Sequence, residues 1–331
     1  MLDDLPATLG PYRVLRRLGA GGMAEVLLGQ AVGASGFSRL VAIKRPLRSY
    51  RDHDELTRLL IAEARVGSRI HHRNLVAVHD LGFHEGSYYV VMDFVDGADL
   101  GSLRRRSQPS VDLAAHLVAE VLLGLHHLHR LPDEHGRPLG LVHRDVSPSN
   151  VLISSSGEVK LADYGIVKAT RLAGNTAANI RRGKFGYMSP EQVAGEPLDA
   201  RSDLFSVMVM LVELLTGERP FDGEGPAQVL ERIREAAAPN LDAVPDALRP
   251  LVESGLSATP EVRHGDALTL RAALLYAWPA AATVGPPEVA TWVAHASADA
   301  TSSGREPTRR TLFEPDSATA THSRDREEPP E

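Results

Sequence analysis

The spacing of apolar residues changes once along this chain of 331 residues, and this change constrains the fold more than any other feature. Up to about residue 95, short apolar runs between glycine-containing turns predict strands at 12–15, 25–28, 40–44 and 88–94. One helix is predicted within this part, at 54–70. Farther along, longer stretches such as 113–129 and 202–215 have the apolar period of helices. A β-rich part followed by an α-rich part predicts an α+β fold of two lobes with a cleft between them.

Bulk composition excludes several classes of function. The net charge of −7 argues against a general nucleic-acid binder, so no nucleic-acid partner is expected. The absence of cysteine excludes disulfides and thiolate chemistry, and it fits a reducing compartment. The first ten residues lack the apolar run of a secretory signal, and the apolar stretches at 205–215 and 272–284 are too short or too charged to span a membrane. We therefore expect a cytoplasmic protein without a membrane span.

The end of the chain has a different composition. From about residue 285 it is rich in proline, serine, threonine, glutamate and arginine and poor in apolar residues. Such a segment cannot bury enough apolar surface to offset the entropy of ordering. A disordered tail is therefore predicted over 285–331.

A glycine-rich turn joins the first two predicted strands. It contains Gly19, Ala20, Gly21, Gly22 and Met23. Glycines allow backbone N–H groups to approach phosphate oxygens closely, although a simple tight hairpin has the same composition. A dinucleotide-binding fold would require a helix after the glycines, and here a strand follows.

Lysine is rare in this chain, which draws attention to Lys44. Of 36 basic residues only four are lysine, at 44, 160, 168 and 184, so 36 − 4 = 32 are arginine. Lys44 ends an apolar strand, and Glu63 lies on the apolar face of the predicted helix, where an unpaired carboxylate is costly. A Lys44–Glu63 ion pair would explain both positions; the alternative is a solvated lysine.

Three further motifs follow in order along the chain. They are His143-Arg144-Asp145-Val146-Ser147-Pro148-Ser149-Asn150, Asp163-Tyr164-Gly165 and Ser189-Pro190-Glu191. Together with the glycine-rich turn, Lys44 and Glu63, this set over residues 12–276 resembles the eukaryotic-type protein kinase family, in the form of bacterial serine/threonine kinases. The resemblance implies an N-lobe over about 12–94 and a C-lobe over about 97–276. It also implies transfer of the γ-phosphate of ATP to a serine or threonine of an unidentified protein substrate.

The resemblance also implies roles for individual residues. Asp145 would accept the proton of the substrate hydroxyl, and Lys44, held by Glu63, would bind the α- and β-phosphates. Asn150 and Asp163 would hold Mg²⁺, with Mn²⁺ as a possible substitute. The ATP site would comprise Leu18, Gly19, Ala20, Gly21, Gly22, Met23, Val26, Ala42, Lys44, Met92, Asp93, Val95 and Asp99. Glu191 and Arg263 match a buried ion pair of the family, and Asp203 matches an acid that supports the catalytic loop.

The chain departs from the family pattern near the catalytic aspartate. Ser147 stands where serine/threonine kinases usually have lysine, and Lys184 stands where they usually have threonine. We hypothesise that Lys184 reaches back to Asp145 and the γ-phosphate and so acts in catalysis. The alternative for Lys184 is a solvated loop residue. A nucleotide-binding scaffold with weak or no catalysis is the alternative for the whole chain.

Glycine at position 67 is a further departure. The family usually has a bulky apolar residue here, which packs against the aromatic residue that corresponds to Tyr164. Glycine also weakens a helix by about 1 kcal/mol. We therefore expect a mobile helix, in which the Lys44–Glu63 pair forms only when a ligand or partner binds.

The segment 163–191 corresponds to the activation loop of the family. It contains Thr170 and Thr176 among basic residues, and Arg144 is the residue that pairs with a phosphorylated loop threonine in related enzymes. Arginine grips phosphate bidentately, so phosphorylation would order the loop. Autophosphorylation at Thr170 or Thr176 is therefore predicted, and a homodimer would allow it. Tyrosine specificity is less expected, because the catalytic loop lacks the arginine-containing form that tyrosine kinases use.

The Lys184 hypothesis predicts that Lys184→Thr lowers turnover by about 100-fold, because a positive charge beside the transferred phosphate is lost. Adding Ser147→Lys to that variant is expected to restore much of the activity. Steady-state kinetics of the single and double variants measure both effects, with Lys168→Thr as a matched control from the same loop. Wild-type turnover of Lys184→Thr would contradict the hypothesis.

Overall fold

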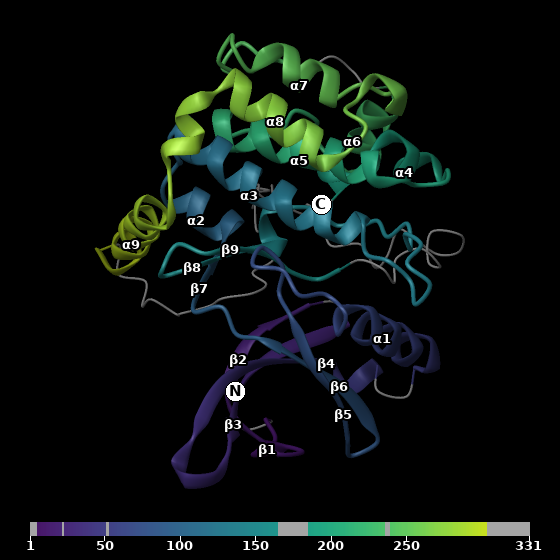
Figure 1. Ribbon diagram of the computed structural model, residues 1–331, viewed down its shortest axis with the longest axis vertical. Helices are drawn as coiled ribbons and strands as arrows, with labels where there is room; N and C mark the ends of the chain where they lie inside the picture. Colours follow the sequence, from purple (N-terminus) through teal and green to yellow (C-terminus); the bar gives the residue numbers. More distant parts are fainter. Residues whose placement is uncertain (1–4, 22, 51–52, 165–184, 236–238, 303–331) are drawn as a thin grey trace, which may run out of the picture.

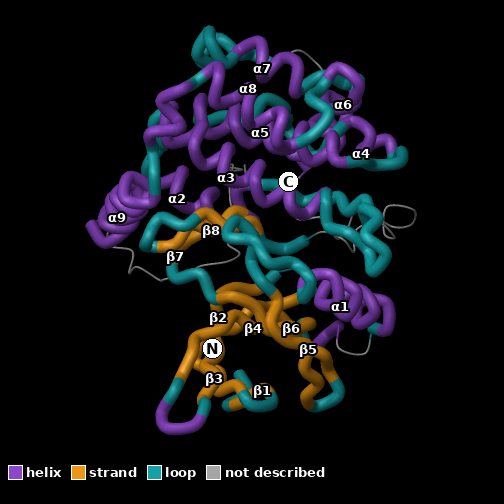
Figure 2. Tube along the Cα trace, viewed as in Figure 1, coloured by secondary structure: helices purple, strands orange, loops and turns teal. Residues whose placement is uncertain are grey.

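The structure is a computed structural model that describes residues 5–21, 23–50, 53–164, 185–235 and 239–302. It has two lobes, a β-rich one drawn at the bottom of Figure 1 and a mainly helical one at the top. Figure 2 shows that the strands of the larger sheet all lie in the first lobe, whereas most helices lie in the second. The predicted α+β architecture is confirmed.

An antiparallel six-stranded sheet forms most of the first lobe, in the order β1-β2-β3-β4-β6-β5. Its strands are β1 (Thr8–Leu9), β2 (Tyr12–Ala20), β3 (Ala24–Val32), β4 (Ser38–Pro46), β5 (Val78–His84) and β6 (Ser87–Asp93). Helix α1 (Asp54–Gly67) packs against β5 and β6, and the short 3₁₀ helices η1 (Ala34–Gly36) and η2 (Arg48–Tyr50) lie at either end of β4. Successive side chains alternate between the faces, so each face has its own apolar cluster.

The second lobe combines a small sheet with a helical core. The sheet consists of β7 (Gly97–Asp99), β8 (Val151–Ser154) and β9 (Val159–Leu161). The α-helices are α2 (Leu100–Arg106), α3 (Val111–His129), α4 (Pro190–Ala194), α5 (Ala200–Thr216), α6 (Pro226–Arg234), α7 (Arg249–Gly255), α8 (Ala267–Ala277) and α9 (Pro286–Ser302). The 3₁₀ helices are η3 (Pro148–Asn150), η5 (Phe185–Tyr187), η6 (Pro260–Val262) and η7 (Pro279–Thr283).

Helices α3 and α5 pack together at the centre of the second lobe. Helix α3 is long and apolar enough to cross a membrane, judged by length and composition alone. The apolar stretches considered from the sequence, 205–215 and 272–284, are other segments. The apolar side chains of α3 nevertheless lie in the protein core: Leu117, Leu122 and Leu128 are all 0% exposed. This burial is what a core helix requires.

The segment that follows α1 attaches the first lobe to the second. Val76 donates its N–H to the Leu161 carbonyl at 3.0 Å, and Leu161 donates to the Asn74 carbonyl at 2.8 Å. The Asn74 side chain, which is buried, donates to Glu120 of α3 at 2.9 Å and to the Val159 carbonyl at 3.0 Å. The loop at the end of α1 is therefore built into the helical lobe.

The structure differs from the sequence-based expectation at the predicted tail. Residues Pro286–Ser302 form helix α9, so the prediction of disorder from 285 is wrong over this range. Val289, Trp292 and Ala296 are buried, and α9 packs against α2 and β8, as the yellow helix in Figure 1 shows. Because the apolar residues are few but recur at helical spacing, they cover one docking face. Residues 303–331 of the predicted tail lie outside the described residues.

Trp292 anchors this helix, since its indole N–H donates to the Ser107 carbonyl at 3.2 Å just after α2. Trp292→Ala is therefore expected to lower the free energy of unfolding by about 3–5 kcal/mol, as large buried aromatic truncations do. Chemical denaturation measures this change. Tyr276→Ala is the matched control, because Tyr276 is 89% exposed and should change stability by only about 0.5 kcal/mol. Equal stabilities of the two variants would contradict the docking of α9.

Candidate active site

Lys44 lies where the two lobes meet. In β4 it is paired with Val26 of β3 and Val90 of β6, and strand alternation directs its side chain to the same face as Ala42. Its Nζ is 2.9 Å from Glu63 Oε1 of α1 and 2.9 Å from Asp163 Oδ1, which follows β9. The predicted Lys44–Glu63 pair is present, and Asp163 joins it from the second lobe.

The electrostatics of this triad suit a phosphate and a cation. Burial by itself lowers the pKa of Lys44, but the charges and hydrogen bonds of Asp163 and Glu63 outweigh it and raise the pKa far above its usual value. Lys44 is therefore a fixed positive charge. One ammonium and two carboxylates sum to 1 − 2 = −1, so the triad has a negative charge that a divalent cation can offset.

The Lys44–Glu63 pair is formed in this structure, whereas the expected mobility of α1 and its dependence on a ligand stay predictions; the surroundings of Gly67 show how α1 packs without a bulky residue there. A Cβ at Gly67 would lie 2.5 Å from Val78 Cγ2 and 3.8 Å from Tyr164 Cε2. The space of the missing side chain is thus filled by Val78 and approached by the Tyr164 ring. Helix α1 packs closely without a bulky residue at 67, and Glu63 reaches Lys44.

Asp203 of α5 holds the catalytic loop through hydrogen bonds to its backbone. This buried carboxylate accepts the backbone N–H of His143 at 2.7 Å and that of Arg144 at 2.8 Å, and it lies 2.8 Å from His129 Nε2. Arg144 has φ = +65°, a left-handed conformation that is uncommon for a residue with a side chain. The two bonds to Asp203 hold the loop in this conformation, so the predicted supporting role of Asp203 is confirmed.

Asp145 and Asn150 lie together at the end of the loop. Asn150 Nδ2 donates to the Asp145 carbonyl at 2.7 Å and to Asp145 Oδ2 at 2.9 Å. Because these bonds involve the amide nitrogen, the amide oxygen Oδ1 is the side-chain atom of Asn150 that could bind a cation. Asn150 Oδ1 and the Asp163 carboxylate are hard oxygen donors, which Mg²⁺ prefers, and the residues therefore fit this ion.

The predicted apolar wall of the ATP site is assembled from both lobes. Leu18, Val26, Ala42, Met92 and Val95 are buried members of one cluster beneath the sheet. Leu152 of β8 belongs to the same cluster and closes it from the helical lobe. Sequence reasoning missed Leu152, because only the packing of β8 against the first lobe brings it into this cluster.

The two predicted acids of the ATP site have other partners. Asp99 is buried and caps α2, where its carboxylate accepts the Ser102 N–H at 2.8 Å and the Ser102 hydroxyl at 2.6 Å. Burial raises the pKa of Asp99, and these hydrogen bonds oppose the rise only in part. Asp93 Oδ1 lies 2.7 Å from His79 Nε2. Asp99 is therefore not a solvated loop residue, and its predicted place near the ribose stays a prediction.

The glycine-rich turn forms the hairpin between β2 and β3. Gly19 and Ala20 lie in β2, and Gly21 closes the turn by donating its N–H to the Ala24 carbonyl at 2.7 Å. The Met23 carbonyl accepts the N–H of Leu47 at 2.9 Å, which ties the turn to the end of β4. Gly22 lies outside the described residues.

Several predicted residues of the activation loop are also not described. Lys184, Thr170, Thr176 and Gly165 lie outside the described residues, so their predicted roles stay predictions. Ser147 is buried and its Oγ lies 3.1 Å from Ser149 Oγ, inside the catalytic loop.

Behind the loop, the predicted Glu191–Arg263 pair is confirmed. Arg263 Nη1 is 2.7 Å from Glu191 Oε1, and Nη2 is 2.9 Å from Oε2, in a buried bidentate arrangement. Burial alone raises the pKa of Glu191, but the Arg263 and Ser202 hydrogen bonds leave it below its usual value. The neighbouring Gln192 donates to the Arg144 carbonyl at 3.1 Å and so links this pair to the catalytic loop.

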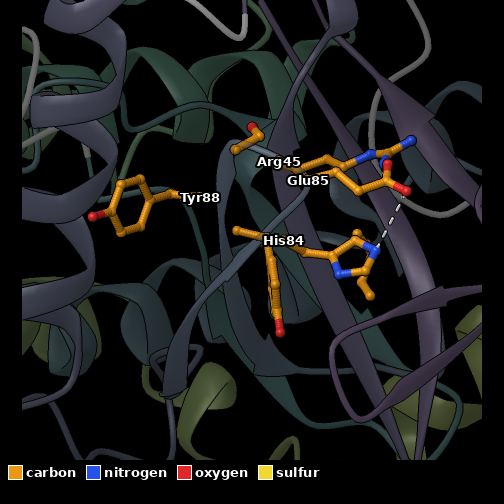
Figure 3. Close-up of a pocket in the computed structure, with 7 residues that line it drawn as sticks. Arg45, His84, Glu85 and Tyr88 are labelled. Carbon is orange, nitrogen blue, oxygen red and sulfur yellow. Dashed lines mark ion pairs between the residues drawn. The ribbon is translucent and has the colours of Figure 1, made fainter.

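A separate small hollow lies on the other face of the first lobe. Figure 3 shows its lining, which consists of Leu9, Arg45, His84, Glu85, Ser87, Tyr88 and Tyr89. Arg45 follows Lys44 in β4, so its side chain points to the opposite face of the sheet, where it pairs with Glu25 at 2.8 Å. This hollow is therefore distinct from the cleft at Lys44.

Comparison with known proteins agrees with this geometry. The family model for the protein kinase domain matches residues 12–275, and the chain belongs to this family. The fold is that of a eukaryotic-type kinase: the kinase domain of Mycobacterium tuberculosis PknI superposes with a TM-score of 0.62 at 28% identity, over 85% of this chain and 100% of that kinase-domain chain.

Several bacterial kinases are similar to this chain in sequence. The tyrosine-protein kinase MasK of Myxococcus xanthus is 36% identical over 77% of this chain and 41% of MasK. The serine/threonine-protein kinase PknL of Mycobacterium tuberculosis is 36% identical over 80% of this chain and 64% of PknL. The probable serine/threonine-protein kinase PknB of Lactococcus lactis is 34% identical over 77% of this chain and 40% of PknB. The chain thus matches between two fifths and two thirds of the length of these relatives.

Asp203 leads to a pH prediction. Burial alone raises its pKa, but the hydrogen bond and charge of His129, followed by the charge and N–H of His143, lower the pKa below 3.8. A carboxylate with a depressed folded pKa stabilises the fold fully above its unfolded pKa and loses this contribution as pH falls through the folded value. Asp203→Asn should therefore cost about 3–5 kcal/mol at pH 7, and the cost should shrink below pH 3.8.

Guanidinium denaturation of both proteins from pH 7 to pH 3 measures this difference. The control is Asp246→Asn, since the Asp246 side chain is 91% exposed. A cost that stays constant over the whole range would show that the Asp203 charge does not stabilise the loop.

Proposed function

We propose that this chain is a serine/threonine protein kinase that transfers the γ-phosphate of Mg-ATP to a hydroxyl of a protein substrate. The observation that carries the proposal is that the expected polar residues contact one another. Lys44 forms ion pairs with Glu63 and Asp163 at 2.9 Å, and Asn150 donates a hydrogen bond to Asp145. The named serine/threonine kinases among the relatives support the same activity. An assembled set of this kind also favours catalysis over a nucleotide-binding scaffold.

The described residues divide the work of phosphoryl transfer. Lys44 supplies a fixed positive charge for the α- and β-phosphates, and Glu63 keeps it in place. The apolar cluster with Val26, Ala42 and Leu152 receives the adenine and excludes water from it. Asp145, oriented by Asn150, accepts the proton of the substrate hydroxyl as its oxygen bonds to the γ-phosphorus, while the bond from the γ-phosphorus to the bridging oxygen breaks and ADP leaves with that oxygen.

Asn150 and Asp163 are the residues that would hold the divalent cation, which neutralises charge on the phosphates when it is bound. Mg²⁺ is the proposed ion, and Mn²⁺ is a possible substitute because it accepts the same oxygen ligands. Among the described residues no cluster of three or more histidine or acidic side chains could hold a metal by itself. This fits a site that relies on phosphate oxygens for part of its coordination.

We also propose regulation by autophosphorylation at Thr170 or Thr176. The support within the described residues comes from Arg144, whose Nε is buried and has no hydrogen-bond partner there. A phosphorylated threonine supplies the acceptor oxygens that such a guanidinium requires. Assembly into a homodimer and location in the cytoplasm are further proposals, the latter resting on the absence of cysteine.

Tyrosine is the competing acceptor, because MasK is named a tyrosine-protein kinase. We therefore expect radiolabelled ATP incubated with the wild-type chain to yield phosphoserine or phosphothreonine, with mass spectrometry locating label at Thr170 or Thr176. Asp145→Asn should lower incorporation by about 100-fold or more, because the general base is lost. Asp246→Asn, an exposed acid, should retain full labelling. Phosphotyrosine alone, or equal labelling of wild type and Asp145→Asn, would contradict the proposal.

A further inference from the structure

Tyr164, directly after Asp163, makes a hydrogen bond that a phenylalanine could not make. Its side chain is 3% exposed, and its hydroxyl donates to the Val76 carbonyl in the segment after α1. Its ring lies edge-on to His143 of the catalytic loop, with centroids 6.1 Å apart and planes at 77°. Tyr164 therefore joins the segment after α1 to the catalytic loop through the residue beside Asp163.

Val76 binds the chain on both sides of Asp163. Its N–H donates to the Leu161 carbonyl at 3.0 Å, and its carbonyl accepts the Tyr164 hydroxyl. The first and last of the four residues from Leu161 to Tyr164 are thus both hydrogen-bonded to Val76. Val76 is itself buried, and Asn74, two residues earlier, is hydrogen-bonded to Glu120 and to the Val159 carbonyl, so the segment around Val76 is held in place.

Asp163 needs this support. Its φ is +58°, in the left-handed region that residues with a Cβ seldom adopt. Such a conformation persists only where the surroundings hold it. In this conformation the carboxylate lies 2.9 Å from Lys44 Nζ, on the side of the cleft.

Gly67 provides the space that the Tyr164 ring occupies beside helix α1. A Cβ there would lie 3.8 Å from Tyr164 Cε2, so even a small side chain would touch the ring, and a larger one would compete with it for space. Gly67 and Tyr164 thus belong together: the small residue admits the tyrosine ring, and the tyrosine hydroxyl adds a hydrogen bond to the Val76 carbonyl.

We propose that Tyr164 is a positioning residue, whose hydroxyl, by bonding to the Val76 carbonyl, holds Asp163 in the conformation that binds Mg²⁺. The inference rests on the proposed function in that Asp163 is taken as a ligand of the nucleotide-bound cation. Tyr164 itself touches neither nucleotide nor cation in this scheme.

Tyr164→Phe tests the proposal, because it removes the hydroxyl and keeps the ring. The readout is binding of a fluorescent ATP analogue to the purified chain, titrated with Mg²⁺. The Mg²⁺ concentration for half-maximal binding is expected to rise about fivefold, the effect of one lost net hydrogen bond. Affinity for the analogue without Mg²⁺ should stay within about twofold of wild type, since the adenine wall and Lys44 are retained. Amide hydrogen exchange over 161–164 should also accelerate, because the turn loses one of its two attachments.

Tyr89→Phe is the matched control, because Tyr89 is also 3% exposed but belongs to the cluster on the opposite face of the sheet. It should leave the Mg²⁺ dependence unchanged. A Mg²⁺ dependence of Tyr164→Phe equal to that of wild type, or an equal shift in both variants, would overturn the role of Tyr164. Failure of the wild-type chain to bind the analogue more tightly with Mg²⁺ would instead overturn the proposed function itself.

Discussion

The ion-paired Lys44 is the interaction on which the rest of the site depends. It brings together strand β4, helix α1 and the turn after β9, three segments that are distant in sequence, through two contacts of 2.9 Å. Because the ammonium is mostly buried, each carboxylate that approaches it is stabilised, and the removal of either one would leave Lys44 with a single ionic partner. The position of α1 relative to the second lobe is therefore an electrostatic property as much as a packing one.

A second set of interactions, hydrogen bonds to the backbone in and near the second lobe, holds the segments that contain Asp163 and the catalytic loop. Asn74 and Val76 pair with Leu161, and Asp203 holds the N–H groups of His143 and Arg144. Both groups of hydrogen bonds hold residues with positive φ, at Asp163 and Arg144, directly beside the chemistry. The catalytic geometry thus depends on strained backbone that buried neighbours keep in place, and this is where sequence patterns are least informative.

Polar residues of the site were largely predictable, whereas their local partners were not. The Lys44–Glu63 pair is predicted from residue type and position, and the resemblance to the protein kinase family identifies Asp145 and Asn150 through the catalytic-loop motif. The expected mobility of α1 rests on a missing contact at Gly67 and stays a prediction, but the contact itself is replaced. Val78 and Tyr164 approach from other segments to fill that space, which no spacing rule at 67 could reveal.

The sequence by itself determined the two-lobed α+β class, the order of the motifs and the identity of the charged groups, because apolar periodicity and catalytic residue types are local properties of the chain. Only the tertiary structure decided that Pro286–Ser302 docks as a helix, that Asp99 is a buried cap, and that Leu152 closes the apolar wall. Each of these depends on what a distant segment presents at that point in space. Burial and hydrogen-bond partners are set by such encounters between segments, and composition along the chain does not contain them.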